Sequence, residues 1–132
     1  MPTIIRKPVS NIIETRRDVL LAANWRVHSS VWTPPTDVYE TELSLIVKVE
    51  IAGMREDDFE VAVEEHILII RGNRPGQNER RAYHQMEIRF GKFEIAIGLP
   101  SGINLEEAAA EYKEGFLTVT FPKIRAIQIE VE

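Results

Sequence analysis

The chain has 132 residues, of which 44% are hydrophobic and 28% are charged, and it has no cysteine. This length and composition are typical of one globular domain with short extensions rather than of a disordered chain. Without cysteine, a disulfide scaffold, a thiolate zinc site and a cysteine nucleophile are excluded. No apolar run approaches the roughly 20 residues that a membrane-spanning helix needs, so we expect a soluble, cytoplasmic protein.

The net charge of −5 is unevenly distributed along the sequence. Residues 1–31 carry five basic and two acidic side chains, a net of +3, and the remaining residues therefore carry −8. Nucleic-acid binding usually requires a basic stripe on the folded part of a protein. Because an acidic domain with a small basic arm does not provide one, we expect no nucleic-acid partner. A minor contact of the arm with RNA or lipid headgroups stays open.

Residues 1–32 are interpreted as a separate, partly helical N-terminal arm. Apolar residues at positions 12, 13, 19, 20 and 23 share one side of a helix that Ser10 would cap. A helix this short is not stable alone in water, so it is expected to form only where another surface covers its apolar side. The arm ends at Thr33-Pro34-Pro35-Thr36, because neither a helix nor a central strand crosses such a sequence.

From Asp37 onward, apolar and polar residues alternate with the period of a strand that has one buried face. Turn residues separate these segments about every ten residues, which indicates an all-β fold built as an antiparallel sandwich or barrel. A helical turn at 105–110 is an alternative to a strand at 108–112; we favour the strand, because Tyr112 leads directly into a turn. The other expected strands are 43–51, 59–64, 67–70, 93–99 and 116–121, with 67–70 covered on both faces.

A long excursion interrupts this series of strands. Residues 71–81 are polar and contain glycine, and residues 83–89 then alternate in the manner of a strand. Loops of this length in compact domains are usually functional. A strand that projects from its own domain keeps unpaired backbone groups, so we expect it to pair with the edge of another sheet.

The sequence has no recognisable catalytic or cofactor site. His28, His66 and His84 share no metal-binding spacing, and the glycines do not form a phosphate-binding loop. The acidic cluster at residues 56–60 lacks the spacing of a calcium loop and is interpreted as a solvated turn before a strand. We therefore expect no enzyme, cofactor or metal; an enzyme with an unrecognised site is the alternative.

The C-terminal tail, residues 124–132, contains three aliphatic side chains that point to one side of an extended chain: Ile127, Ile129 and Val131. Burying an isoleucine contributes about 1.5–3 kcal/mol, so we expect these side chains to be covered. Either the tail is a final strand of the same domain, or it adds to a groove on a neighbouring subunit.

Several segments carry motifs of one known family. Residues 110–123 follow the pattern Ala-x-x-x-Asn-Gly-x-Leu with a final Pro-Lys, except that Glu114 replaces the asparagine. Pro34–Thr41 is similar to the family's Pro-x-x-Asp-(Ile/Val)-Tyr-Glu-Thr opening, and residues 127–129 are similar to its Ile-x-Ile tail motif. On these residues, positions 33–123 resemble the α-crystallin domain of the small heat-shock proteins. A second departure is Ile51-Ala52-Gly53, where the family usually has Leu-Pro-Gly.

The resemblance implies an immunoglobulin-like sandwich and an ATP-independent chaperone, a holdase, that binds unfolding client proteins. It also implies large homo-oligomers built from homodimers. In each dimer the excursion would act as the exchanged strand of bacterial, archaeal and plant members and pair with an edge strand of the partner. The residues assigned to this exchange are Tyr83, His84, Met86 and Ile88 on the excursion, and Val38 and Tyr39 on the edge strand.

The resemblance also implies that the tail residues Ile127 and Ile129 dock on a neighbouring dimer. Their groove would lie between the strand at 59–64 and the strand at 108–112, and it would be lined by Val61, Val63 and Ala109. Clients would bind apolar residues of the arm: Ile12, Ile13, Val19, Leu20 and Trp25. The alternative function is a monomeric adaptor, like the co-chaperone relatives of this fold.

Overall fold

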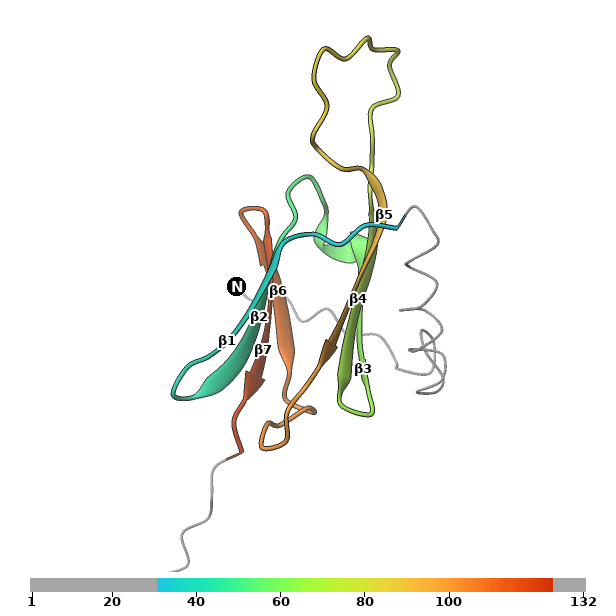
Figure 1. The fold of residues 1–132 in the computed structure, drawn as a ribbon. Coiled ribbons are helices and arrows are strands. Elements are labelled where there is room, and N and C mark those ends of the chain that lie inside the picture. Colours follow the sequence, from blue (N-terminus) through green and yellow to red (C-terminus); the bar gives the residue numbers. More distant parts are fainter. Residues whose placement is uncertain (1–30, 125–132) are drawn as a thin grey trace, which may run out of the picture.

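The computed structural model describes residues 31–124 and places them in seven strands and one short 3₁₀ helix (Figure 1). The arm at residues 1–30 and the tail at 125–132 lie outside the described residues. The elements are β1 (Thr36–Glu40), β2 (Ser44–Glu50), η2 (Glu56–Asp58), β3 (Phe59–Glu64), β4 (Ile67–Arg74), β5 (Gly91–Gly98), β6 (Ala109–Lys113) and β7 (Phe116–Pro122).

The described strands form two antiparallel sheets, which confirms the predicted all-β fold. One sheet has the order β1-β2-β7-β6 and the other has the order β3-β4-β5. A single hydrophobic cluster joins residues from both sheets, so the two sheets pack face to face as a sandwich. In this arrangement β1 and β6 are the edges of the first sheet, and β3 and β5 are the edges of the second.

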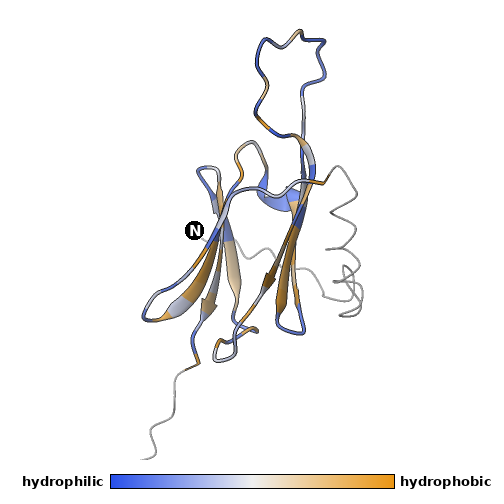
Figure 2. Cartoon of the chain, in the orientation of Figure 1, coloured by the Kyte–Doolittle hydropathy of each residue, from blue (hydrophilic) through white to orange (hydrophobic). Residues whose placement is uncertain are grey.

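Alternation along the strands determines which side chains face the core. In β2, Leu45, Val47 and Val49 are buried, whereas the residues between them are partly exposed. Leu68, Ile69 and Ile70 of β4 are all buried, as expected for a strand covered on both faces. Figure 2 shows hydrophobic colour concentrated in the strands, whereas the excursion is mostly hydrophilic with a few hydrophobic stretches.

A chain of aromatic rings crosses the core. The ring of Phe93 lies 5.8 Å from that of Trp32 and 6.2 Å from that of Phe59, and Phe59 lies 5.0 Å from Tyr112. Phe59 and Phe93 are the two strand partners of Gly72, one on each side. A glycine is needed there because a Cβ would lie 2.4 Å from Cζ of Phe93.

Trp32 belongs to the sandwich, whereas the sequence assigned it to the arm. It is 6% exposed and forms a parallel bridge with Phe93. Its backbone N–H donates to the carbonyl of Lys92, and its carbonyl accepts from the N–H of Glu94. The sequence-based boundary at residue 33 was therefore wrong, because the double proline comes after the first residue that pairs with β5 rather than before it.

The remaining strand predictions differ from the structure mainly at the ends of strands. β6 confirms that the segment after residue 108 is a strand and not a helix. Asn104 accepts hydrogen bonds from the N–H groups of Glu106 and Glu107, which forms a turn before β6. Residues 83–89, predicted as a strand, have no strand partner among the described residues of the single chain. Their pairing stays a prediction that requires a second chain.

We predict that Gly72→Ala lowers the free energy of unfolding by about 1–3 kcal/mol, the usual range for overpacking a core. The added methyl group meets the buried ring of Phe93. Gly98→Ala is the matched control, because nothing lies within 4 Å of a Cβ at that β5 position. Urea unfolding of both variants at one protein concentration checks this. Equal stabilities of the two variants would contradict the packing account.

Candidate functional site

The first candidate surface is the free edge of β1. This strand pairs with β2 on one side only, so its other side is unpaired among the described residues. Val38 is 47% exposed and Tyr39 is 43% exposed. Val38 pairs with the buried Val47 and so lies on the core side of the sheet, whereas Tyr39 pairs with Ile46 and lies on the outer side. The edge therefore combines unpaired backbone groups with apolar side chains on both faces.

The second candidate surface is the excursion that joins β4 to β5 and projects beyond one end of the sandwich (Figure 1). Residues 75–89 are all exposed. Three of them are large and apolar or aromatic: Tyr83 is 47%, Met86 57% and Ile88 67% exposed. His84 is exposed as well. Met86 and Ile88 are two residues apart, so they share one side of an extended chain.

The base of the excursion is held by Arg74 at the end of β4. Its Nε and Nη2 atoms donate to the carbonyl of Arg89, at 2.8 and 2.5 Å, respectively. Its guanidinium also lies 4.7 Å from the centre of the Trp32 ring, and that of Arg89 lies 5.8 Å from the same ring. Cations stack favourably on indole faces. The excursion therefore leaves the sandwich at a defined point above the buried Trp32.

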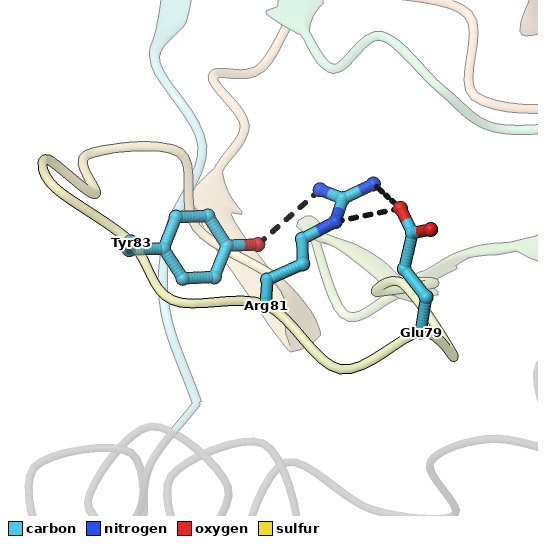
Figure 3. Close-up of polar contacts among 3 residues, drawn as sticks. All are labelled: Glu79, Arg81 and Tyr83. Carbon is cyan, nitrogen blue, oxygen red and sulfur yellow. Dashed lines mark hydrogen bonds and ion pairs between the residues drawn. The ribbon is translucent and has the colours of Figure 1, made fainter.

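Part of the excursion is organised by its own side chains (Figure 3). Arg81 donates from Nε and Nη2 to Oε1 of Glu79, at 2.8 and 2.5 Å. Its Nη1 donates to the hydroxyl of Tyr83 at 3.4 Å. The hydrogen bond to Glu79, and then that to Tyr83, raise the pKa of the Arg81 guanidinium.

The third candidate surface is the predicted tail groove between β3 and β6. These are edge strands of opposite sheets, and the 5.0 Å contact between the rings of Phe59 and Tyr112 places their edges opposite each other. Val61 is buried, and Val63 is partly buried against the core. The structure does not place Ala109 with them. Ala109 pairs with Thr120 on the outer face, whereas Ala108 packs against the core and Ala110 pairs with the buried Val119.

Tyr112 fixes the position of β6 relative to the loop after β2. Its hydroxyl donates to the carbonyl of Ile51 at 2.8 Å and accepts from the N–H of Met54 at 3.3 Å. The N–H of Ile51 also donates to the carbonyl of Gly115 in the turn after β6. The departures from the family pattern at 51–53 and at Glu114 therefore lie in one hydrogen-bonded region. Glu114 adopts a positive φ of 52° in this turn.

The remaining predicted residues fall outside the described residues. These are the tail residues Ile127 and Ile129 and the arm residues Ile12, Ile13, Val19, Leu20 and Trp25. Within residues 31–124, no group of three or more histidine or acidic side chains is placed to hold a metal ion. In the same range, no helix is long and apolar enough to cross a membrane.

Sequence reasoning missed Trp32 and Arg74 as the residues that hold the base of the excursion. A tryptophan just before a double proline and an arginine at the end of an apolar strand carry no signal of contact on their own. The sequence placed Leu43 on the aliphatic face of the expected strand 43–51, whereas the structure leaves it 67% exposed before the start of β2. Ile124 is 60% exposed as well. Leu43 accepts a backbone hydrogen bond from Lys123, next to Ile124, so both lie where the chain leaves β7.

Comparison with known proteins places these features in a family. Residues 37–132 match the Hsp20/alpha crystallin family. Small heat shock protein C2 of Rickettsia felis is 34% identical over 92 residues, which cover 68% of this chain and 60% of that protein. The 17.4 kDa class I heat shock protein of Arabidopsis thaliana is 33% identical over 99 residues, which cover 73% of this chain and 64% of that protein.

A solved structure of a small heat-shock protein from Xylella fastidiosa is 25% identical and superposes with a TM-score of 0.67, over 78% of this chain and 99% of that one. The chain spans about three-fifths of the length of the curated relatives that it matches. Because the family match extends over well more than half of the sequence, the chain belongs to the Hsp20/alpha crystallin family.

Proposed function

We propose that this protein is an ATP-independent chaperone of the cytoplasm that holds unfolding proteins and prevents their aggregation. It works as a homodimer that assembles into a large homo-oligomer. Family membership supports the proposal, and so does the distribution of exposed apolar side chains. The proposal covers the whole chain, including the arm and the tail that lie outside the described residues.

The distribution of exposed apolar side chains is the observation that carries the proposal. Of the seven large apolar or aromatic side chains that are exposed in residues 31–124, five lie on β1 or on the excursion. Both segments also have backbone groups without strand partners in the described part of the chain. An unpaired edge with apolar side chains favours pairing with another strand. The excursion of a second copy provides a strand with the matching composition.

In the proposed dimer, the excursion of each protomer adds to β1 of its partner, so the exchange is reciprocal. The backbone groups of β1 would gain a second row of hydrogen bonds. Val38 and Tyr39, on opposite faces of β1, would each meet alternate side chains of the excursion. Met86 and Ile88 would then meet one face together, because they are two residues apart.

Assembly beyond the dimer is proposed to use the tail. Ile127 and Ile129 would dock at the edges of β3 and β6 of a neighbouring dimer. Val63, Ala108 and Tyr112 support this location, because they are partly buried at the rim of the core between those two strands. Ala109, which lies on the outer face of β6, is no longer included in the proposed groove.

Client holding follows from the same apolar surfaces. A protein that binds unfolded chains must expose apolar surface to them and keep it covered at rest. The arm and the assembly contacts provide such surface, which dissociation of subunits would expose. The net charge of −8 on residues 32–132 would keep a loaded complex soluble.

The function is tested by heating an aggregation-prone enzyme with the purified chain in the absence of ATP. We expect suppression of light scattering, and by sedimentation a native mass far above the 15.1 kDa of one chain. No suppression, or suppression only with added nucleotide, would contradict the holdase. A stable monomer that leaves aggregation unchanged would favour the adaptor instead.

The role of the tail is tested by the double variant Ile127→Ala and Ile129→Ala. Each substitution removes most of an apolar contact worth about 1.5–3 kcal/mol when it is fully buried, and this loss repeats at every tail contact of the oligomer. We expect dimers or small oligomers by sedimentation. Gln128→Ala, between the two isoleucines, is the matched control and should keep the native size. A double variant of native size would refute the tail contact.

A further inference from the structure

Several side chains that lie two residues apart on the excursion are hydrogen-bonded to each other, although no strand within residues 31–124 pairs with this segment. Glu79, Arg81 and Tyr83 form one such series, with Arg81 in the middle (Figure 3). Gln85 donates in the same way to Glu87. Side chains two residues apart lie on the same side only when the backbone is extended. These bonds therefore favour an extended backbone over the many other conformations of an exposed loop.

The base of the excursion is fixed as well. The two hydrogen bonds from Arg74 to the carbonyl of Arg89 join its two ends, and the stacking of Arg74 on Trp32 anchors that junction to the core. Because its two ends are joined, the excursion has less conformational entropy than a loop whose ends move independently. The segment from Glu79 to Glu87 is consequently restricted at its base by Arg74 and along its length by Arg81.

Ordering a flexible segment during binding opposes association, because the backbone entropy is lost at that moment. If only a fraction of molecules holds the binding conformation, the apparent dissociation constant rises by the inverse of that fraction. A segment that is already extended avoids much of this loss. Hydrogen bonds within the segment thus affect dimerisation without contacting the partner.

We propose that Glu79, Arg81 and Tyr83 hold the excursion as a prepared strand before the partner binds, and that Arg81 is the positioning residue for strand exchange. The inference rests on the proposed function, because it assumes that the exchanged partner is a second copy of this chain. The polar series lies along one side of the strand. His84, Met86 and Ile88 are exposed and take no part in the hydrogen bonds of this series, so they are available for the partner.

The test compares Arg81→Ala with Arg80→Ala in the full-length chain that also carries Ile127→Ala and Ile129→Ala, because this background is expected to form dimers or small oligomers in place of the large oligomer. Both variants remove one exposed arginine, but the described part of the structure gives Arg80 no bond to Glu79 or Tyr83. Sedimentation measures the dimer dissociation constant. Exchange between differently labelled subunits measures the dissociation rate, and the two values together give the association rate. Backbone nitrogen relaxation over residues 79–83, measured at a protein concentration below the dissociation constant, reports the ordering of the segment before the partner binds.

For Arg81→Ala, we expect lower backbone order parameters over residues 79–83 and association slowed by about two- to fivefold, the size expected when one exposed ion pair is lost. The dissociation rate should stay unchanged, and Arg80→Ala should match the background protein. If the two variants behave alike, Arg81 does not prepare the strand. An increase of the dissociation rate alone would also overturn the inference, because Arg81 would then act by contacting the partner.

Different outcomes would contradict the role of Arg81 and the proposed dimer. A native protein that stays monomeric would contradict the proposed dimer, whereas lower order parameters in Arg81→Ala than in Arg80→Ala would still show the ordering. A native protein that dimerises, with equal order parameters over residues 79–83 in the two variants, would leave the function intact and refute the inference.

Discussion

The backbone of β1 has hydrogen-bonding groups that its own sheet leaves unused. A two-layer sandwich has four edge strands, and each must be covered, twisted away or paired with another chain. Here β1 carries two exposed apolar or aromatic side chains, Val38 and Tyr39, and no described segment covers its free side. The excursion also has exposed apolar side chains, and residues 31–124 offer it no strand partner. The proposed dimer is the arrangement that satisfies both segments at once.

Packing in the core positions the surfaces that this arrangement uses. The aromatic chain from Trp32 to Tyr112 runs through both sheets, and Gly72 makes room for it. At one end of the chain, Trp32 supports Arg74 and with it the base of the excursion. At the other end, Tyr112 ties β6 to the loop after β2, next to the edge where the tail is proposed to dock. The same packing that stabilises the sandwich thus positions both assembly surfaces.

Much of the fold was predictable from the sequence, because alternation has a strict physical cause. A strand with one buried face must place apolar residues at every second position, and β2, β3 and β7 do so over most of their length.

Prediction from the sequence failed where the position of a residue depends on which residue of another strand it pairs with. In Ala108-Ala109-Ala110 the side chains are identical, so only the register with β7 shows that Ala109 points outward. Trp32 was missed for the same reason, because its place in the core depends on pairing with Phe93, a residue 61 positions away. The bonds of Arg81 require an extended backbone that composition alone does not reveal.

The most direct measurement of the central claim is a disulfide scan between two chains, which is unusually clean because the native sequence has no cysteine. One chain carries Tyr39→Cys, and the other carries a single cysteine substitution at each position from 83 to 88 in turn. Opposed residues on neighbouring strands lie about 4.5–5.5 Å apart, within the range that a disulfide bridges. The account predicts one position of efficient cross-linking, the residue opposed to Tyr39, with much weaker cross-linking two residues to either side and none at the positions between. Cross-links at none of these positions, or at all of them equally, would contradict pairing of the excursion with the edge of β1.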